Sequence, residues 1–514
     1  MPTHTTRFDP HTNNSSAGQP KGSAAAPPNP PKRGRLAVIG GGWAGCAAAV
    51  AATEQGWAVD LYEAAPAAGG RAKAIAAQVE TDTETETETD RLDNGQHILL
   101  GAYSATLALL RTLGVDTHDA LLRSPLDLRD NAGQGFALPT WAGLATSNTN
   151  NAKATIKPAS IGASLRHQAR MACAAVWSVW QCRHWPMTAR LQLLRLMVRW
   201  RLSGFTCHSQ DTVADLCNSL APCVMHDFIE PLCVSALNLS PQHASGALWL
   251  RVLKDALLSG PGSSDLLLPR RDLSALFVHP CLAWLRQHGA TVHTGTRVTG
   301  LLRVGNGWQL NTALTPKPSL PYDQIVVATP AAQAAALVWP HNAFWAQAAS
   351  ALTHTSIATV YAQSTNTGTS TYTGNSAHVA WRAPMLALRG GAAQFVFNRS
   401  QLLSPASNTA SCHIAAVVSD SGDASRDQIT ASVMQQLATQ WPQAQWVWTQ
   451  TVVEKRACFA CTPQAARPVM GVAPGLWACG DYVFGPYPST LEGAVRSAQA
   501  VVSAIARPGT TQQA

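Results

Sequence analysis

The strongest constraint on the fold of this chain is a glycine-rich turn between an apolar run and a run of small residues that favour a helix. The apolar run spans residues 36–39, and the turn, Gly40–Gly45, has the pattern G-x-G-x-x-G. Small helix-forming residues lead to Gly56, and a second apolar segment, 58–62, ends at Glu63. This order predicts a buried strand, a helix and a second strand, the unit that binds dinucleotides in doubly wound folds.

Each glycine of the turn has its own physical role in such a unit. Gly40 permits the tight turn, Gly42 lets a pyrophosphate approach the backbone, and Gly45 lets the helix pack against the strand. The N-terminus of the helix offers free N–H groups and the positive end of its dipole to the phosphates. Glu63 stands where a carboxylate binds a ribose diol. The alternative is a glycine-rich turn in an ordinary strand–helix–strand unit.

A pair of glycines further along the chain indicates which dinucleotide the unit binds. The sequence Gly69-Gly70-Arg71 follows Glu63 closely and resembles the second signature of FAD enzymes of the amine oxidase and phytoene desaturase superfamily. In those enzymes the glycines pass close to the cofactor and the arginine lies near its phosphates. The resemblance implies FAD as the cofactor. The alternative for Arg71 is a surface charge on a loop.

The C-terminal region offers a second set of cofactor contacts. Residues 476–479 form a short apolar run before Gly480 and Asp481, and a helix is predicted over 489–505. Asp481 can hydrogen-bond the ribityl hydroxyls, and the helix dipole near Leu491 can stabilise the anionic edge of a reduced flavin. An ordinary strand–helix turn is the alternative.

The composition is that of a large folded protein with few charges. The chain has 514 residues, of which 46% are hydrophobic and 13% charged, and its formal net charge is +8. This length suits two domains, and the charge favours a membrane surface over nucleic acid, for which no binding motif is present. The C-x-x-C of Cys458 and Cys461 lacks the second pair of a zinc site, so we expect no metal and reduced thiols in the cytoplasm. Residues 1–34 carry no secretory signal and predict a disordered extension.

One segment has an unusual distribution of charge. No Asp or Glu occurs between Asp130 and Asp211, and two helices are predicted there with a break near Pro186. Tryptophans interleave with the basic residues, which are Lys153, Lys157, Arg166, Arg170, Arg183, Arg190, Arg195, Arg199 and Arg201. Such helices suit peripheral docking to an anionic membrane, at the inner face of the cytoplasmic membrane. The alternative is a cap whose tryptophans face the core and whose arginines are solvated. No run is long and apolar enough to predict a spanning helix.

Other elements follow from periodicity and turn residues. The acidic run 81–90 predicts an exposed loop. The segment 92–101 after it has glycine and amide groups followed by apolar residues, which suits a segment that runs beside a flat ring, with Gly95, Gln96 and His97 as expected contacts. Helices are predicted over 104–112 and 273–288, and a hairpin over 301–310. Strands are predicted over 291–298, 325–328, 357–363, 393–397, 413–419 and 445–453.

The whole set of motifs resembles one family more closely, the hydroxysqualene dehydroxylases, also called squalene-associated FAD-dependent desaturases. The resemblance is carried by WAGCAAA, LDNGQHILLGAY, SDLLLPRRDLS and GDYVFGPYPSTLEGAVRSAQ, which span nearly all of the chain from Arg35 onward. It implies reductive removal of an allylic hydroxyl from hydroxysqualene in squalene and hopanoid synthesis. In that reaction hydride passes from N5 of reduced FAD to the allylic carbon, and water is lost.

The motifs and the resemblance together predict an α/β fold. A Rossmann-like FAD-binding domain of the glutathione-reductase type is expected over 35–130, 262–335 and 455–508, and an interleaved α+β domain for substrate and membrane over 131–261 and 336–454, with a tail at 509–514. The residues expected to contact FAD are Gly40, Gly42, Trp43, Ala44, Gly45, Glu63, Gly70, Arg71, Gly95, Gln96, His97, Val298, Gly480, Asp481 and Leu491.

The resemblance leaves the proton donor and the source of electrons open. His97, Tyr103 and Tyr487 are candidate donors because they lie near flavin motifs in the sequence, although a structural role is favoured for His97. No second G-x-G-x-x-G occurs, so either a partner protein or a reduced carrier is expected to deliver electrons to FAD.

Other functions also stay open. A polyprenyl desaturase runs hydride transfer in the opposite direction on the same fold, so the sequence does not fix the direction. An amine oxidase would need an aromatic cage, of which Tyr487 could form half, and a third alternative is a flavin-binding scaffold without catalysis. The sequence also leaves the oligomeric state and the stereochemistry undetermined.

Overall fold

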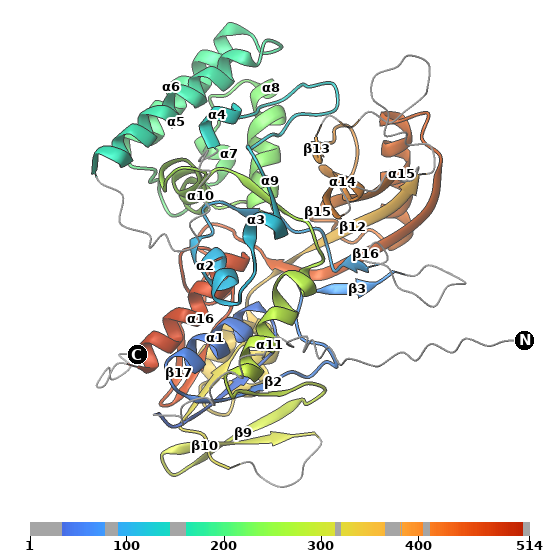
Figure 1. Cartoon of the computed structure of the whole chain (residues 1–514). Helices are drawn as coiled ribbons and strands as arrows, with labels where there is room; N and C mark the ends of the chain where they lie inside the picture. Colours follow the sequence, from blue (N-terminus) through green and yellow to red (C-terminus); the bar gives the residue numbers. More distant parts are fainter. Residues whose placement is uncertain are drawn as a thin grey trace, which may run out of the picture.

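The computed structural model describes residues 33–77, 91–143, 161–313, 320–364, 381, 383–403 and 412–506. In Figure 1 the first and last helices of the chain lie side by side near a parallel sheet, a second sheet lies beyond it, and a group of helices lies at the opposite end of the molecule. The predicted tail, the acidic run 81–90 and all but the last two residues of the predicted extension lie outside the described residues.

A six-stranded sheet holds the glycine-rich turn. Its order is β17-β18-β11-β1-β2-β8, and all neighbouring strands are parallel except β17 and β18. The strands are β1 (Arg35–Ile39), β2 (Ala58–Tyr62), β8 (Thr291–His293), β11 (Gln324–Val327), β17 (Gly471–Ala473) and β18 (Leu476–Ala478). The predicted α/β fold with a Rossmann-like sheet is therefore confirmed.

The central strand is covered on both faces because successive side chains of a strand point to opposite sides. Leu36 and Val38 pack in one cluster with three helices, α1 (Trp43–Glu54), α11 (His279–Gln287) and α16 (Leu491–Ile505). Ala37 and Ile39 pack in a second cluster, which includes residues of the hairpin β9 (Val298–Val304) and β10 (Gly307–Thr312) and of α12 (Ala331–Val338). The small residues of α1 let it pack closely against α16, which brings both ends of the chain together (Figure 1).

The predicted strand over 291–298 is only partly correct. Strand β8 ends at His293, a turn follows, and Val298 begins β9. Gly295 in this turn has a φ of +64°, a conformation that favours glycine, so the chain leaves the sheet before Val298.

A five-stranded antiparallel sheet forms the second layer, in the order β13-β14-β15-β12-β16. Its strands are β12 (His354–Ser364), β13 (Met385–Ala387), β14 (Phe395–Asn398), β15 (Cys412–Ser419) and β16 (Trp446–Phe459). Helix α15 (Arg426–Gln440) packs on one face, against Val360, Val396 and Ala416. The opposite face carries Phe395 and Phe397 toward the interior of the molecule.

A further group of helices forms a cap. Its two longest are α5 (Ile161–Gln181) and α6 (Met187–Leu202), so the predicted pair with a break near Pro186 is confirmed. The other cap elements are α4 (Thr140–Gly143), α7 (Val213–Leu216), α8 (Pro222–Val224), the π-helix η2 (Met225–Ile229), α9 (Glu230–Leu237) and α10 (Gly246–Leu258).

Short elements connect these layers. Strands β3 (Ala74–Ala76) and β4 (Arg91–Asp93) pair with each other, and β5 (Leu99–Leu100), β7 (Leu266–Pro269) and β6 (Leu121–Ser124) form a small sheet. The other helices are α2 (Ser104–Thr112), α3 (Thr117–Ala120), the π-helix η3 (Ser274–Val278), α13 (Ala343–Ser350) and α14 (Arg399–Leu403). The boundaries proposed from the sequence for the two domains stay a prediction.

Candidate cofactor and substrate site

A cavity of about 740 Å³ lies where the two sheets meet. The glycine-rich turn, the segment 94–98, the five-stranded sheet and the start of α16 all contribute to its lining. All fifteen residues expected from the sequence to contact the cofactor, except Gly45, line this cavity. The structure therefore brings together motifs from the beginning, middle and end of the chain.

The glycines of the turn meet different surroundings. Gly40 has a φ of +111°, and a Cβ there would lie 2.7 Å from the Ala328 carbonyl oxygen. A Cβ on Gly45 would lie 1.8 Å from the Gly40 carbonyl oxygen, so Gly45 permits packing and does not line the cavity. A Cβ on Gly42 would have the Gly70 Cα, at 3.8 Å, as its only neighbour within 4 Å, so it would project into open space. The turn thus has the space for a pyrophosphate that its sequence predicts.

The Glu63 carboxylate is fixed at the end of β2. Its Oε2 accepts a hydrogen bond from the Gly41 N–H at 2.6 Å, and its Oε1 accepts one from the Ala65 N–H at 2.8 Å. These bonds hold the carboxylate beside the turn and at the cavity wall, where a ribose diol would meet it.

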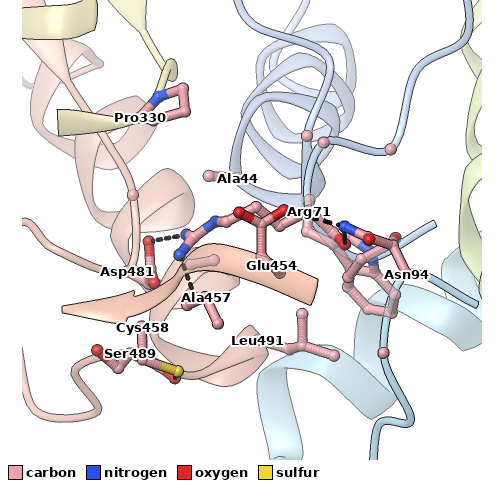
Figure 2. Close-up of a pocket in the computed structure, with 18 of the residues that line it drawn as sticks. Ala44, Arg71, Asn94, Pro330, Glu454, Ala457, Cys458, Asp481, Ser489 and Leu491 are labelled. Atoms are coloured by element: carbon pink, nitrogen blue, oxygen red, sulfur yellow. Dashed lines mark hydrogen bonds and ion pairs between the residues drawn. The ribbon is translucent and has the colours of Figure 1, made fainter. Parts of the chain in front are cut away.

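Arg71 and Asp481 form an ion pair inside the cavity (Figure 2). The Arg71 guanidinium also donates to the Ala457 carbonyl oxygen at 2.6 Å. The negative charge of Asp481 raises the pKa of Arg71. Arg71 thus lies in the cavity wall in an ion pair, which does not fit the alternative of a surface charge on a loop.

The segment after β4 is held against Arg71 and the five-stranded sheet. The Asn94 side chain donates to the Arg71 carbonyl oxygen at 3.0 Å and to Glu454 Oε2 at 3.1 Å. His97 Nδ1 lies 2.8 Å from the Gly95 carbonyl oxygen, so this nitrogen carries the proton. Burial lowers the pKa of His97, which keeps the ring neutral and its Nε2 unprotonated. This arrangement suits a structural residue better than a proton donor.

Helix α16 begins at the cavity wall. Thr490 caps the helix, because its Oγ1 accepts a hydrogen bond from the Gly493 N–H at 2.9 Å. Leu491, the first helical residue, lines the cavity as the sequence predicts. The positive end of the helix dipole therefore points toward the cavity.

Sequence reasoning missed several polar residues of this cavity. Asn94, Thr329, Glu454 and Cys458 all line it. Asn94 lies in the segment 92–101, which was expected to run beside a flat ring, but it was not among the residues expected to contact the cofactor. Glu454 and Cys458 lie on a long strand whose pattern gives no sign of a cofactor.

The residues present fit a flavin dinucleotide. Four buried side-chain oxygens of the cavity lining have no hydrogen-bond partner among the described residues: Gln96 Oε1, Asn238 Oδ1, Thr329 Oγ1 and the Tyr482 hydroxyl. Buried polar atoms normally have partners, so these four oxygens are consistent with a polar ligand that supplies them. The open space beside Gly42 points the same way.

A second cavity, of about 430 Å³, adjoins the first and is predominantly apolar. Helices α5, α6, α9 and α10 supply most of its wall, with Phe136, Met171, Leu194 and Phe228 among its side chains. Six residues line both cavities: Ile98, Tyr103, Ser235, Ala236, Leu237 and Thr490.

Of the two candidate tyrosines, Tyr103 lies in the wall shared by both cavities, and Tyr487 lines the apolar cavity. The guanidinium carbons of Arg251 and Arg496 lie 5.4 and 5.0 Å from the centre of the Tyr487 ring. Because these two guanidinium groups already lie over the Tyr487 ring, the ring does not suit an amine-binding cage.

Comparison with known proteins agrees with this geometry. A family model described as flavin containing amine oxidoreductase matches residues 43–506. The chain belongs to this family. With the fit of the cavity, membership establishes FAD as its cofactor and the protein as an FAD-dependent oxidoreductase.

Individual relatives show which named enzymes this chain resembles. The hydroxysqualene dehydroxylase of Rhodopseudomonas palustris is 26% identical over 497 residues, which cover 92% of this chain and 98% of the relative. That of Sinorhizobium fredii is 24% identical and covers 90% and 95%. The zeta-carotene desaturase of Zea mays is 31% identical over only 84 residues, or 16% of this chain and 13% of the relative.

Solved structures share the fold of this family member. A putative protoporphyrinogen oxidase from Exiguobacterium has a TM-score of 0.61 at 16% identity, covering 92% of this chain and 98% of the other. Cyclohexylamine oxidase from Brevibacterium oxydans has a TM-score of 0.56 at 16% identity, with the same two coverages. At such identities the likeness concerns the fold alone.

Proposed function

We propose that this protein removes the hydroxyl group of hydroxysqualene by reduction and releases squalene and water. The observation that carries the proposal is the apolar cavity that adjoins the cofactor cavity, because a long hydrocarbon with one polar group needs such a pair of spaces. The near full-length likeness to hydroxysqualene dehydroxylases supports the same conclusion.

Reduced FAD, when bound, supplies the hydride that replaces the hydroxyl on the allylic carbon. The residues of the chain bind and orient the two molecules. We propose that the turn around Gly42 and the start of α16 hold the dinucleotide, with Glu63 at the ribose and the Arg71–Asp481 pair beside the flavin end. The apolar side chains of the second cavity would exclude water from the reacting carbon.

Polyprenyl desaturation and amine oxidation have weaker support. The zeta-carotene desaturase match covers a small part of either chain. No lysine lines either cavity within the described residues, and the Tyr487 ring is already covered by arginines.

We propose further that α5 and α6 dock on an anionic membrane through their exposed side, which we call the docking face. Within the described residues no helix is long and apolar enough to cross a bilayer. The exposed large apolar side chains of these two helices are Leu165, Val176, Trp177, Trp180, Met187, Leu191, Val198 and Leu202. Exposed arginines lie among them, at positions 166, 170, 183, 195, 199 and 201. This combination suits the headgroup region of a bilayer.

Of the four tryptophans in this segment, two are exposed, as membrane docking requires, and two face the core, as in an ordinary cap. Trp177 and Trp180 are each 52% exposed, whereas Trp185 and Trp200 are buried in the cap. Val176, Val198 and Leu202 are exposed and also line the apolar cavity. A substrate dissolved in the bilayer would therefore enter this cavity directly from the docking face. Electrons would come from a separate protein or carrier.

Product analysis tests the proposed reaction. Purified holoenzyme, reduced without oxygen by dithionite, is mixed with hydroxysqualene, and the products are identified by mass spectrometry. Squalene is expected. No squalene, together with dehydrogenation of phytoene or squalene by the oxidised enzyme, would show a desaturase, and hydrogen peroxide formed from amines would show an amine oxidase.

A further inference from the structure

Tyr103 occupies a distinctive place in the wall shared by the two cavities. Three residues of that wall carry hydroxyl groups, namely Tyr103, Ser235 and Thr490. The Ser235 hydroxyl donates to the Leu232 carbonyl oxygen at 3.0 Å, and the Thr490 hydroxyl donates to the Tyr487 carbonyl oxygen at 2.9 Å. The hydrogens of both groups are thus committed within the protein.

The Tyr103 hydroxyl keeps capacity for another partner. It interacts with the Thr490 side chain, and because the Thr490 hydrogen is given to the Tyr487 carbonyl oxygen, the single hydrogen of Tyr103 goes to Thr490 and its lone pairs stay available. Burial raises the pKa of Tyr103, and the nearby Glu492 carboxylate raises it further. The side chain therefore stays neutral and can accept a hydrogen bond from another hydroxyl group.

The chemistry of the substrate says where a hydrogen bond is needed. A polyprenyl alcohol of this kind carries one oxygen on a long hydrocarbon, and burial of that oxygen without a partner is unfavourable. Most of the apolar cavity wall is carbon. The oxygen-bearing carbon must also lie next to the cofactor cavity. Both requirements meet at the shared wall, beside Tyr103.

Glu492 fixes the backbone that carries Tyr103. The Glu492 side chain is fully buried, and its carboxylate accepts hydrogen bonds from the N–H groups of Ala105 at 3.0 Å and Thr106 at 2.9 Å. It also accepts one from the Thr106 hydroxyl at 2.8 Å and one from Arg496 Nε at 2.7 Å. Tyr103 is the residue that precedes the first turn of α2, so these bonds tie it to the start of α16.

We propose that the Tyr103 hydroxyl hydrogen-bonds the hydroxyl of the polyprenyl alcohol and so selects the alcohol over the hydrocarbon, and that Glu492 is the positioning residue that holds Tyr103 in place. This inference rests on the proposed function. It assigns a binding role to Tyr103 and involves no proton transfer from it.

A binding experiment tests the inference without turnover. Oxidised holoenzyme is titrated with hydroxysqualene and with squalene in the same detergent, and the shift of the flavin absorbance band gives the two dissociation constants. Tyr103→Phe should weaken binding of the alcohol roughly tenfold, the usual scale for one hydrogen bond, and leave binding of the hydrocarbon unchanged. Flavin content equal to that of the wild type shows that the variant is folded.

Tyr361→Phe is the matched control, because the Tyr361 hydroxyl donates to the Asp93 carbonyl oxygen at 2.8 Å and Tyr361 lines neither cavity. It should leave the ratio of the two dissociation constants as in the wild type. A preference for the alcohol that persists in Tyr103→Phe, or an equal loss of affinity for both ligands, overturns the role of Tyr103. A wild-type enzyme without any preference for the alcohol overturns the proposed function itself.

Discussion

Arg71 and Asp481 are 410 positions apart in the sequence, yet Arg71 Nη2 lies 2.6 Å from Asp481 Oδ1. The pair joins the segment after β2 to the segment after β18, on the wall of the cofactor cavity. The Asp481 side chain is 11% exposed and that of Arg71 34%, and Asp481 supplies the main charge that neutralises Arg71. The cavity thus depends on contact between the two ends of the folded chain.

Breaking this pair should weaken cofactor retention. Asp481→Asn leaves the Arg71 charge without its partner inside the cavity, and we expect FAD to dissociate at least tenfold more readily. Equilibrium dialysis of the apoprotein against FAD measures the effect. Asp423→Asn, on an exposed turn, is the control and should bind as the wild type does. Equal affinity in Asp481→Asn would contradict the assignment of this pair to the cofactor site.

The open space at Gly42 gives a second prediction. Gly42→Val would project a side chain into the cavity where the pyrophosphate is proposed to lie, and the purified variant should lose its visible flavin absorbance. Gly300→Val is the control, since a Cβ on Gly300 meets only Asn311, at 3.5 Å. A Gly42→Val protein as yellow as the wild type would remove the turn from the cofactor site.

Glu492 should contribute strongly to stability. Glu492→Ala would remove the acceptor of two backbone N–H groups of α2 and the partner of Arg496, at a cost of about 3 kcal/mol in the free energy of unfolding. Glu492→Gln keeps an acceptor oxygen and should lose less. Urea unfolding curves give both values. A change below about 0.5 kcal/mol in the alanine variant, the size typical of surface substitutions, would show that the link between α2 and α16 is unimportant.

Asp93 should make stability depend on pH. Burial raises the pKa of Asp93 to about 7, although Arg399 and the Leu273 N–H lower it in part. The folded state therefore holds a proton that the unfolded state, with a pKa near 3.8, has lost. As the pH rises from about 4 to about 7, the free energy of unfolding of the wild type should fall relative to that of Asp93→Asn, by up to about 1.4 kcal/mol per pH unit. Parallel stability curves for the two proteins across this range would contradict the prediction.

The docking face gives a prediction about membranes. Replacement of Arg195, Arg199 and Arg201 by serine should weaken binding to anionic vesicles at least tenfold, because each basic residue near such a surface contributes about 1 kcal/mol. Cosedimentation with vesicles measures it. A control protein in which the exposed Arg111, Arg286 and Arg426 are replaced carries the same change of charge away from α5 and α6. If both triple variants sediment alike, the docking face is wrongly placed.

Local sequence patterns predicted the elements well where the pattern itself determines the structure. The bounds of β2 and α2 agree with the expected 58–62 and 104–112 because each element is short and ends at a clear signal. The strand predicted over 291–298 was too long, since Gly295 turns the chain away from the sheet. The glycine signatures located most of the cofactor cavity because close approach of backbone and phosphate requires glycine at fixed spacing.

What the sequence left undetermined depends on contacts between distant segments. Nothing near Tyr103 shows that it lies between two cavities, because its position follows from the burial of Glu492 against α2. Burial of Trp200 and exposure of Trp177 likewise depend on which faces of α5 and α6 meet the rest of the cap. Glu454 joins the cavity only because β16 pairs with β12 beside the segment 94–98.

A single-turnover measurement tests the proposed reaction most directly. Holoenzyme is reduced without oxygen, excess reductant is removed, and hydroxysqualene is added while flavin absorbance and squalene are followed together. We predict that FAD is reoxidised and that one molecule of squalene appears for each FAD. Reduced flavin that stays reduced in the presence of hydroxysqualene, with no squalene formed, would contradict the proposed function.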